Sequence, residues 1–494
     1  MADGGLWRHR DFRRLWIGDS LSQLGTQIGV LAVPLVAITE LDATTFQLGV
    51  LVALQTAAFL VIGLPAGAWC DRMRKRPVLI AADLVRAALL LTIPAAALLD
   101  RLTLPHLYAV VAAHGIATVF FDVSYQSYLP HLVGREHLVD GNGKLEASRT
   151  VAHAAGPAAG GYLVQWFTAS VAVAADAVSF VWSALWLSRI KVREAPPDRA
   201  RRAPLRAEIA DGLRFVFGNP ILRALALQGA CAVLFIGASQ AVLLPFLVRT
   251  VGLSPGAIGL LSALGSLGAV GGALVTTRLT RRLGRARAMI GYIVVAGSAS
   301  LLIPLTAPGW RLAFLVVGEM VMMAFIVAFN VVQVSYRQTI CPDHLLGRMN
   351  ATMRFVMWGT TPLGGLLGGV LGTAVGLRNT LWITGVGTLL PVLWLVFSPL
   401  GPAALRGVEL AMEPTASGLR SEATREDVVT EGSMARASGA SASLQQSGIL
   451  GQRAGGDEPQ HVGAGAGPVD GVRLGQGVAG PVEQGEHGAG VPGQ

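Results

Sequence analysis

The sequence predicts an all-α membrane protein with 12 transmembrane helices in two pseudo-symmetric six-helix bundles, and three observations support this fold class. First, the 494 residues are 52% apolar and only 14% charged, with a mean hydropathy of +0.54, whereas soluble domains carry roughly 25% charged residues. Second, long uncharged runs alternate with short basic clusters, which indicates a polytopic membrane protein and not a nucleic-acid binder. Third, matching residues recur at a fixed spacing in the two halves of the chain.

The predicted helices follow from length, because a spanning helix needs about 20 mostly apolar residues. After a short N-terminal segment (1–14), the N-terminal bundle occupies 15–189, and the C-terminal bundle occupies 222–398. The first six helices are predicted at 15–38, 45–68, 78–99, 105–127, 142–167 and 169–189. The second six are predicted at 222–248, 255–277, 287–307, 310–334, 347–373 and 376–398.

The distribution of basic residues predicts the orientation. The loops on the side of the N-terminus carry 27 Lys and Arg residues, and the opposite loops carry four, namely Arg101, Arg249, Arg311 and Arg378. Cytoplasmic loops of membrane proteins are enriched in Lys and Arg. We therefore expect a multi-pass protein of the cell (plasma) membrane with both termini in the cytoplasm.

Two segments outside the bundles differ from the rest in composition. The stretch 190–221 is predicted to be a cytoplasmic linker, whose second half repeats apolar residues every fourth position, as in an amphipathic helix at the membrane surface. The tail 399–494 is rich in Gly, Ala, Ser and Gln and lacks hydrophobic periodicity. Such a segment buries too little apolar surface to offset its ordering entropy, so we expect it to be disordered.

An internal repeat relates the two bundles at an offset of 208 residues. The matched pairs are Phe121 with Phe329, Tyr128 with Tyr336, Asn142 with Asn350, Leu163 with Leu371, and Gly160-Gly161 with Gly368-Gly369. A fixed offset over some 50 residues that preserves a helix, a basic loop and a Gly-rich helix predicts two parallel six-helix repeats. Two parallel six-helix repeats resemble the architecture of the major facilitator superfamily, whose transporters bind their substrate near the membrane midplane, between the two halves.

Two motifs resemble signatures of the major facilitator superfamily. The loop GAWCDRMRKR at 67–76 resembles the signature G-x-x-x-D-R-x-G-R-R, with Arg74 in place of the consensus Gly. The resemblance implies a gating loop formed by Gly67, Asp71, Arg72, Arg74 and Arg76. Here Asp71 would face a helix N-terminus or a basic partner in the other half. An ordinary basic cytoplasmic loop is the alternative.

The second motif, AHAAGPAAGG at 152–161, resembles the G-P-x-x-G-G signature of antiporters in this superfamily. Gly156, Gly160 and Gly161 leave a helix face without side chains where another helix can approach, and Pro157 permits a bend. Ordinary helix packing would explain the glycines but not the proline among them.

More broadly, residues 7–398 resemble the efflux branch that contains enterobactin exporters and macrolide-efflux proteins. The phrases LWRHRDFRRLWIGDSLSQLGTQI, FFDVSYQSYLPHLVGREHLVDGNGKLEASR and ADAVSFVWSALWL carry this resemblance. It implies alternating access and proton-driven export of a small amphipathic compound. One departure concerns the fourth span, where drug/proton antiporters often carry an Arg and this chain carries none.

Ionisable residues inside predicted spans are candidates for function, because each costs roughly 2.5–3.5 kcal/mol at the membrane centre. Glu319 lies near the midplane in the run FLVVGEMVMMAF. Apolar surroundings favour the neutral form of a carboxyl group, the condition for proton exchange near neutral pH. Asp19, Gln23 and Gln27 form a polar stripe at four-residue spacing, which favours a wet cavity, although Asp19 could be interfacial.

The remaining polar candidates allow both functional and structural interpretations. An imidazole such as that of His114 gains and loses a proton near neutral pH, which suits a proton switch. A lone histidine in a membrane helix, however, usually serves only in helix packing. Asp176 could be structural or face a cavity. Gln240, in a seventh span of mixed aromatic and polar character, could contact an amphipathic ligand. The pairs Asp83 with Arg86 and Glu146 with Arg149, each three residues apart, favour structural or gate-forming roles.

Several function classes lack a signal in the sequence. There is no phosphate-binding loop of the G-x-x-x-x-G-K-[S/T] type, no metal-ligand spacing and no nucleophile elbow. The three cysteines lie far apart and make no disulfide framework. We therefore expect no enzyme activity, no catalytic residue, no metal and no cofactor.

The sequence as a whole predicts a secondary active exporter whose partners are a small-molecule substrate, protons as coupling ion and the lipid bilayer. We expect a monomer that does not bind nucleic acid. Asp19, Gln23, Gln27, His114, Gln240 and Glu319 are the candidates for the substrate and proton pathway, between the first, fourth, seventh and tenth spans. The same architecture also permits an uptake symporter, and a non-transporting membrane sensor or assembly factor is an alternative from another class.

Overall fold

The structure is a computed structural model that describes residues 6–402 except 135–136, 193, 195–204 and 343–344. Inside helices, the side chains of residues 64, 67, 68, 71, 139 and 205–208 are also outside the described part. Every element in the described part of the chain is helical. The predicted tail lies outside this part from residue 403 onward, as does the middle of the predicted linker.

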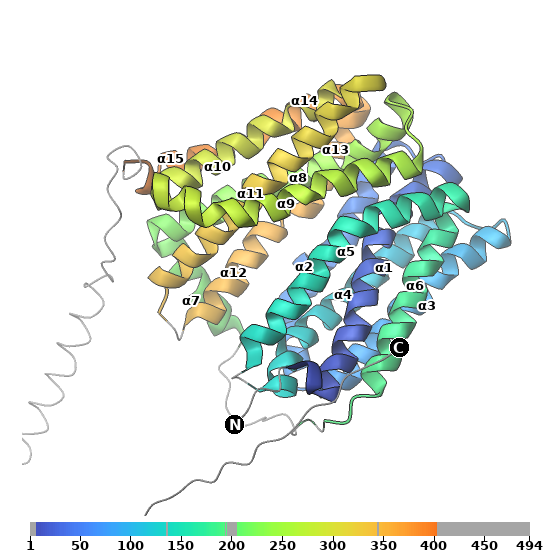
Figure 1. Ribbon diagram of the computed structural model, residues 1–494, viewed down its shortest axis with the longest axis horizontal. Helices are drawn as coiled ribbons and strands as arrows, with labels where there is room; N and C mark the ends of the chain where they lie inside the picture. Colours follow the sequence, from blue (N-terminus) through green and yellow to red (C-terminus); the bar gives the residue numbers. More distant parts are fainter. Residues whose placement is uncertain (1–5, 135–136, 193, 195–204, 343–344, 403–494) are drawn as a thin grey trace, which may run out of the picture. The chain divides into compact units, whose positions relative to one another are not determined.

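The N-terminal bundle contains the six predicted helices (Figure 1). A short 3-10 turn, η1 (Leu6–Arg8), leads into α1, and a π-helical turn, η2 (Val36–Glu40), extends α1 at its far end. The helices are α1 (Arg10–Leu35), α2 (Thr45–Asp71), α3 (Lys75–Leu98), α4 (Leu104–Val133), α5 (Leu138–Trp166) and α6 (Ala169–Ser188).

The C-terminal bundle follows α7 (Leu205–Gly218), the helix predicted in the linker. Two predicted spans are each broken into two helices near Pro362 and Pro391, because proline lacks the backbone donor that would continue a helix. The helices and turns are α8 (Pro220–Pro245) with η4 (Phe246–Thr250), α9 (Pro255–Leu283), α10 (Arg285–Ser300) with η5 (Ile303–Leu305), η6 (Gly309–Arg311), α11 (Leu312–Ile340), α12 (Leu346–Trp358), α13 (Thr361–Ala374), α14 (Leu377–Gly387) and α15 (Pro391–Val396).

Eleven helical segments of the described chain are long and apolar enough to cross a membrane. They correspond to eleven of the twelve predicted spans, with α12–α13 and α14–α15 each counted as one. The twelfth, α5, has 29 residues and is long enough, but it combines His153, Pro157 and several glycines with charges near its start. Its polarity is explained by its position, since α5 packs between α1 and α9.

Side-chain caps define where several helices begin. Thr44 and Gln47 form a capping box at the start of α2, in which Thr44 Oγ1 accepts from the Gln47 backbone and Gln47 Oε1 accepts from the Thr44 backbone. Thr103, Thr168 and Ser254 cap α4, α6 and α9 with their side-chain oxygens, which accept from backbone N–H groups three residues later. These side chains satisfy backbone donors that otherwise have no partner at a helix N-terminus.

The structure extends the repeat well beyond the residues from which it was inferred. Helices α4, α5 and α6 begin at Leu104, Leu138 and Ala169, and their counterparts α11, α12 and α14 begin 208 residues later. Helices α1 and α3 and the turn η2 have counterparts α8, α10 and η4 that begin 210 residues later. The two-residue difference therefore falls in the connection between α10 and α11, where a loop tolerates it.

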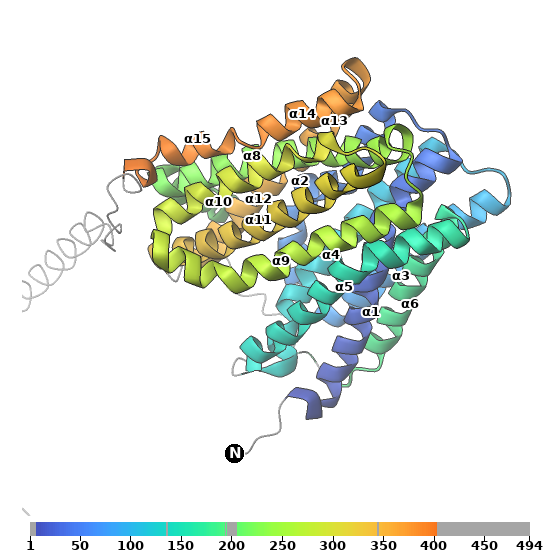
Figure 2. The same ribbon diagram turned by 45° about the horizontal axis from the view of Figure 1, so that its top comes forward.

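The two bundles meet mainly along two helix pairs, α5 with α9 and α2 with α13, and α2 also contacts α8 and α12 (Figures 1 and 2). A Cβ atom on Gly259 would lie 2.2 Å from the carbonyl oxygen of Pro157, and one on Gly161 would lie 2.4 Å from that of Pro255. In the other pair, a Cβ on Gly49 would lie 2.5 Å from the carbonyl oxygen of Gly365. Only glycine fits such close backbone approaches.

The G-P-x-x-G-G motif lies at this interface. Gly161 faces α9, whereas Gly156 and Gly160 face Gln27 and Ile28 of α1. The repeated glycine Gly369 faces Gly49 and Phe46 of α2. The motif thus allows α5 to pack closely on a helix of its own bundle and on a helix of the other bundle at the same time.

Hydrogen bonds reinforce the contact between bundles at the ends remote from the basic loops. The backbone N–H of Gly256 donates to Gln165 Oε1 at 3.0 Å, and the Arg249 guanidinium donates to the carbonyl of Ala43 at 2.7 Å. These residues lie where α5 ends, where α9 begins and just before α2. The bundles are therefore closed on the side opposite the loop 72–76.

We predict that Gly259→Val disrupts this closure, because overpacking a close contact costs about 1–3 kcal/mol. A cysteine introduced at Leu31, which packs in the apolar clusters of both bundles, should then react faster with a maleimide in purified protein. The matched control is Gly271→Val on the same helix, where an added Cβ meets nothing within 4 Å. Equal cysteine reactivity in the two variants would contradict the assignment of the closed end.

Candidate functional site

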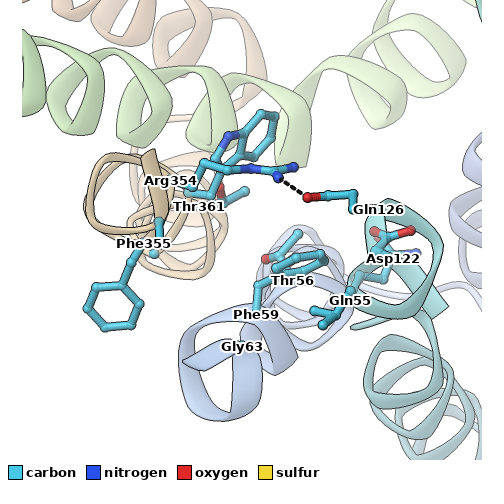
Figure 3. Close-up of a pocket in the computed structure, with 13 residues that line it drawn as sticks. Gln55, Thr56, Phe59, Gly63, Asp122, Gln126, Arg354, Phe355 and Thr361 are labelled. Atoms are coloured by element: carbon cyan, nitrogen blue, oxygen red, sulfur yellow. Dashed lines mark hydrogen bonds between the residues drawn. The ribbon is translucent and has the colours of Figure 1, made fainter. Parts of the chain in front are cut away.

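Two adjoining cavities lie between helices of the two bundles and share Asp122, Gln126 and Arg354. We refer to them together as the inter-bundle cavity. The first, of about 450 Å³, is lined by Gln55, Thr56, Phe59, Gly63, Asp122, Val123, Gln126, Ala351, Arg354, Phe355, Trp358, Gly359 and Thr361 (Figure 3). The second, of about 600 Å³, is lined by Asp19, Asp122, Tyr125, Gln126, Leu129, Pro130, Leu138, Asn142, Gly143, Leu145, Glu146, Arg149 and Arg354.

The first part of the cavity combines aromatic walls with a few polar groups. Phe59 from α2 and Trp358 from α12 supply apolar surface from opposite bundles. The Arg354 side chain extends from α12 toward α4, where its Nη1 donates to Gln126 Oε1 at 3.3 Å, with Asp122 on the same helix (Figure 3). An apolar pocket with a few placed polar groups is typical of a small-molecule site.

The second part of the cavity is more charged and is formed where α1, α4 and α5 approach the basic loops. Asp19 lines it and accepts a hydrogen bond from Gln23 Nε2 at 3.3 Å. Glu146 and Arg149, predicted as a pair, lie 3.9 Å apart and both line the cavity. Their side chains are largely exposed, so the pair contributes little to stability and remains available to a ligand.

The predicted polar stripe on α1 thus joins the cavity at one end only. Gln27 lies further along the helix, where its Nε2 is 3.5 Å from His153 Nε2 on α5. The Gln27 side chain also covers Gly156 of the G-P-x-x-G-G motif. The stripe therefore runs from the cavity at Asp19 into the packed contact between α1 and α5.

The other three predicted pathway residues do not line the inter-bundle cavity. The His114 ring lies 5.8 Å from the Phe180 ring, and its buried Nε2 has no hydrogen-bond partner in the described part of the chain. Gln240 is exposed on α8. Glu319 is 9% exposed and packs against Gly265 of α9. The predicted chamber between the first, fourth, seventh and tenth spans is therefore only partly matched, since neither α8 nor α11 lines this cavity.

The predicted gating loop is tied to its own bundle. The backbone N–H groups of Lys75 and Arg76 donate to the two carboxylate oxygens of Glu194, each at 2.6 Å, and Arg76 Nε donates to the carbonyl of Leu187 at 2.9 Å. Glu194 thereby occupies the N-terminus of α3, where a carboxylate is favoured. Arg72 and Arg74 are exposed. The side chain of Asp71 and the surroundings of Gly67 lie outside the described residues, so their gating role stays a prediction.

Sequence reasoning missed Asp122, Gln126, Arg354 and Glu194 as site residues. Asp122 was available as an acid within the apolar fourth span, in the phrase FFDVSYQSY. In the sequence, Arg354 differs in no way from the other basic residues near a predicted cytoplasmic loop. The repeat pairs Arg354 with Glu146, 208 residues earlier at the equivalent place on α5, and only the structure shows that both line the cavity.

Comparison with known proteins identifies the family. Residues 6–416 match the family described as Transmembrane secretion effector, within the major facilitator superfamily. The chain belongs to this family. It is therefore a multi-pass secondary transporter and not an enzyme.

Two relatives of this transporter are exporters. The multidrug efflux pump Tap of Mycolicibacterium fortuitum is 28% identical over 401 residues, covering 79% of this chain and 95% of that protein. The enterobactin exporter EntS of Citrobacter koseri is 26% identical over 349 residues, covering 69% of this chain and 80% of that protein. The resemblance to enterobactin exporters stated from the sequence is thus confirmed.

Solved structures confirm the predicted major facilitator fold. The nucleoside transporter NupG aligns with a TM-score of 0.63 at 13% identity, over 78% of this chain and 98% of that one. A bacterial homologue of the iron transporter ferroportin aligns with a TM-score of 0.63 at 18% identity, over the same shares of the two chains. Likeness at these identities establishes the fold alone.

We predict that Glu194→Ala destabilises the folded protein by about 0.5–2 kcal/mol, the usual effect of losing a helix N-terminal cap. Thermal unfolding of the detergent-solubilised transporter should show a lower midpoint. Glu146→Ala is the matched control, since the Glu146 side chain is 70% exposed and its ion pair is long. If both variants unfold at the same temperature, the Glu194 carboxylate does not anchor α3.

Proposed function

We propose that this transporter exports a small amphipathic compound, such as a drug, an antibiotic or a siderophore-like molecule, by alternating access with proton antiport. The observation that carries the proposal is the inter-bundle cavity, in which aromatic side chains from both bundles surround a few charged groups. An amphipathic molecule would place its apolar part against Phe59 and Trp358 and its polar part near Asp122 and Arg354. The exporters Tap and EntS support the outward direction.

The closed ends of the bundles support an alternating-access cycle. With the basic loops in the cytoplasm, as their Lys and Arg content favours, the glycine contacts of α5 with α9 would seal the outer side. The cavity would then be reached from the cytoplasm, and an exporter loads its substrate in this state. Rocking of one bundle against the other would open the outer side.

Proton coupling requires groups that change charge during the cycle. Asp19 lines the cavity and Glu319 is buried in the C-terminal bundle, so we propose both as proton-binding sites. Gln23, Gln27 and His114 would extend the polar path from Asp19 along α1 and α4, while Gln240 is a candidate substrate contact. Carboxyl groups in membrane-embedded helices are the usual carriers of such proton steps.

We predict that purified transporter in liposomes with an acidic lumen accumulates at least one of ethidium, a macrolide and a catecholate siderophore, and that a proton ionophore abolishes this accumulation. Accumulation coupled to proton flow in the same direction would instead indicate a symporter. The absence of movement of any compound, with or without a gradient, would favour a sensor or assembly factor.

Trp358→Ala should raise the KM for the transported compound about tenfold, since losing apolar contact in a binding pocket costs roughly 1–3 kcal/mol. Trp310→Ala is the matched control, because Trp310 is an exposed tryptophan in η6, just before α11 and outside the cavity. Initial rates measured over a range of concentrations separate KM from the maximal rate. Equal effects of the two substitutions would exclude the cavity as the binding site.

The orientation yields an independent prediction. Cysteines introduced at Arg74 and Arg281 should react with a membrane-impermeant maleimide only in inverted vesicles, and one at Arg311 only in intact cells. Arg74 lies between α2 and α3 and Arg281 lies in the last turn of α9, at the same ends of the two repeats, while Arg311 lies at the opposite ends of the helices. Labelling of Arg74 and Arg281 from opposite sides would contradict the proposed topology.

A further inference from the structure

The charged residues that line the inter-bundle cavity come unevenly from the two bundles. The N-terminal bundle supplies four of them, whereas Arg354 of α12 is the single one among the described residues of the C-terminal bundle. The four are Asp19, Asp122, Glu146 and Arg149. The C-terminal bundle otherwise contributes neutral residues, namely Ala351, Phe355, Trp358, Gly359 and Thr361. One wall of the cavity thus joins a single cation to mainly apolar surface.

The Arg354 guanidinium has hydrogen-bond donors to spare. An arginine side chain carries five N–H donors. In the described part of the chain, Arg354 makes one hydrogen bond, from Nη1 to the neutral Gln126 Oε1, and no ion pair. The donor–acceptor distance of 3.3 Å is slightly longer than is typical for such a bond. Arg354 is exposed, so its remaining donors are accessible from the cavity.

A second arginine on the same helix is held differently. Arg348 is not a lining residue of the cavity, and its Nη1 lies 3.2 Å from Asp211 Oδ2 of the linker helix α7. On α12, the arginine outside the cavity therefore has a carboxylate partner, whereas the arginine inside the cavity has a neutral amide. A guanidinium that contacts a cavity and has only a neutral partner is suited to bind an anionic ligand.

The apolar surface of the cavity lies close to this cation. Trp358 follows Arg354 by four residues, and residues four apart share one face of a helix. At the helical rise, their Cα atoms are about 6 Å apart along the axis of α12. Phe59 of α2 lines the same part of the cavity from the other bundle (Figure 3). The arrangement therefore matches a compound that carries an acidic group next to an apolar or aromatic body.

An anionic group would compete well for the guanidinium. Hydrogen bonds from a guanidinium to an anionic oxygen are roughly twice as strong as neutral ones, and they are often bidentate. The present acceptor is the uncharged Gln126 amide on α4. A carboxylate or a similar group could therefore replace this acceptor, at the place where the two bundles touch inside the cavity.

The repeat indicates that the helical framework does not require an arginine here. At an offset of 208 residues, Arg354 corresponds to Glu146 on α5, which has the opposite charge and a side chain that is 70% exposed. Equivalent helices thus carry either charge at this place. The positive charge of Arg354 is therefore better explained by what the cavity binds than by helix packing.

We propose that Arg354 is the recognition residue for an anionic group of the exported compound, so that the substrates are amphipathic acids or zwitterions. A zwitterion would direct its cationic group toward the acidic residues of the N-terminal bundle. This inference rests on the proposed export function and adds to it the charge class of the compound. Its test measures binding and needs no transport.

The test compares two dyes that differ in one functional group. Rhodamine with a free carboxylate is a zwitterion at neutral pH, and its methyl ester is a cation. Fluorescence anisotropy measures the binding of each dye to the purified full-length transporter in lipid nanodiscs. The wild type should bind the free acid more tightly than the ester. Arg354→Gln should weaken binding of the free acid about ten- to hundredfold, the effect of losing a hydrogen bond to a charged group, while the ester should bind nearly as it does to the wild type.

Two further arginine variants serve as controls. Arg348→Gln removes an arginine of the same helix that does not line the cavity, and both dyes should bind this variant as they bind the wild type. Arg354→Lys keeps the charge but loses the planar fork of donors, so it should retain part of the preference for the free acid. Equal losses for both dyes in Arg354→Gln would assign Arg354 a structural role and overturn the proposal. A wild type that does not bind the free acid more tightly than the ester would also overturn it.

Gln126→Glu tests the same contact without removing the arginine. This substitution places a carboxylate where the amide now accepts from Arg354, so the protein itself supplies the anion. Binding of the free acid should then weaken, whereas the cationic ester should bind at least as tightly as before. If both dyes lose affinity equally, the contact acts only as a latch between the bundles and the proposal is wrong.

Binding and transport together separate this inference from the proposed function. Binding of the free acid that depends on Arg354, in a protein that accumulates no compound in liposomes, would support the anion site and contradict export. Accumulation of compounds whose binding does not depend on Arg354 would support export and contradict the anion site.

Discussion

The close backbone contact between glycine-bearing helices of the two bundles determines most of what the structure can do. Where Gly259 meets Pro157 and Gly49 meets Gly365, no side chain separates the helices. Such a contact brings the two backbones close together without intervening side chains. These glycine contacts lie at one end of the bundles. The inter-bundle cavity forms toward the other ends, where the hydrogen bond from Arg354 to Gln126 joins the two bundles.

On this symmetric framework the polar residues are distributed asymmetrically. The helices of the two repeats begin at almost constant offsets, yet the carboxyl groups of Asp83, Asp122 and Asp176 have no acidic counterparts. Burying a charge is expensive, whereas replacing it with an apolar residue usually is not. The symmetry thus accounts for the packing, and the asymmetry places Asp83, Asp122 and Asp176 in the N-terminal bundle, while the buried Glu319 lies in the C-terminal bundle.

The sequence was sufficient to predict the fold, because a membrane helix is recognised by its length and hydropathy, and both are local properties of the chain. It also predicted the contact of Asp83 with Arg86 and of Glu146 with Arg149, since residues three apart share a helix face. It could not place Arg354 beside Gln126, because that contact joins helices 228 residues apart. Similarly, Glu194 follows the bundle in sequence and returns to α3 only in the folded chain.

The position of Glu319 shows why burial and cavity lining need to be considered separately. This carboxyl group is nearly as buried as Asp83 and Asp176, but it packs against the glycine at position 265 and has no ion-pair or hydrogen-bond partner in the described part of the chain. An ionised carboxylate without a partner is unfavourable at such a site. In the proposed cycle, a proton on Glu319 would leave when the packing of α9 on α11 changes, whereas a proton on Asp19, which lines the inter-bundle cavity, would exchange directly with that cavity. The two bundles would then contribute different steps to one cycle: Asp19 would respond to the cavity contents and Glu319 to helix movement.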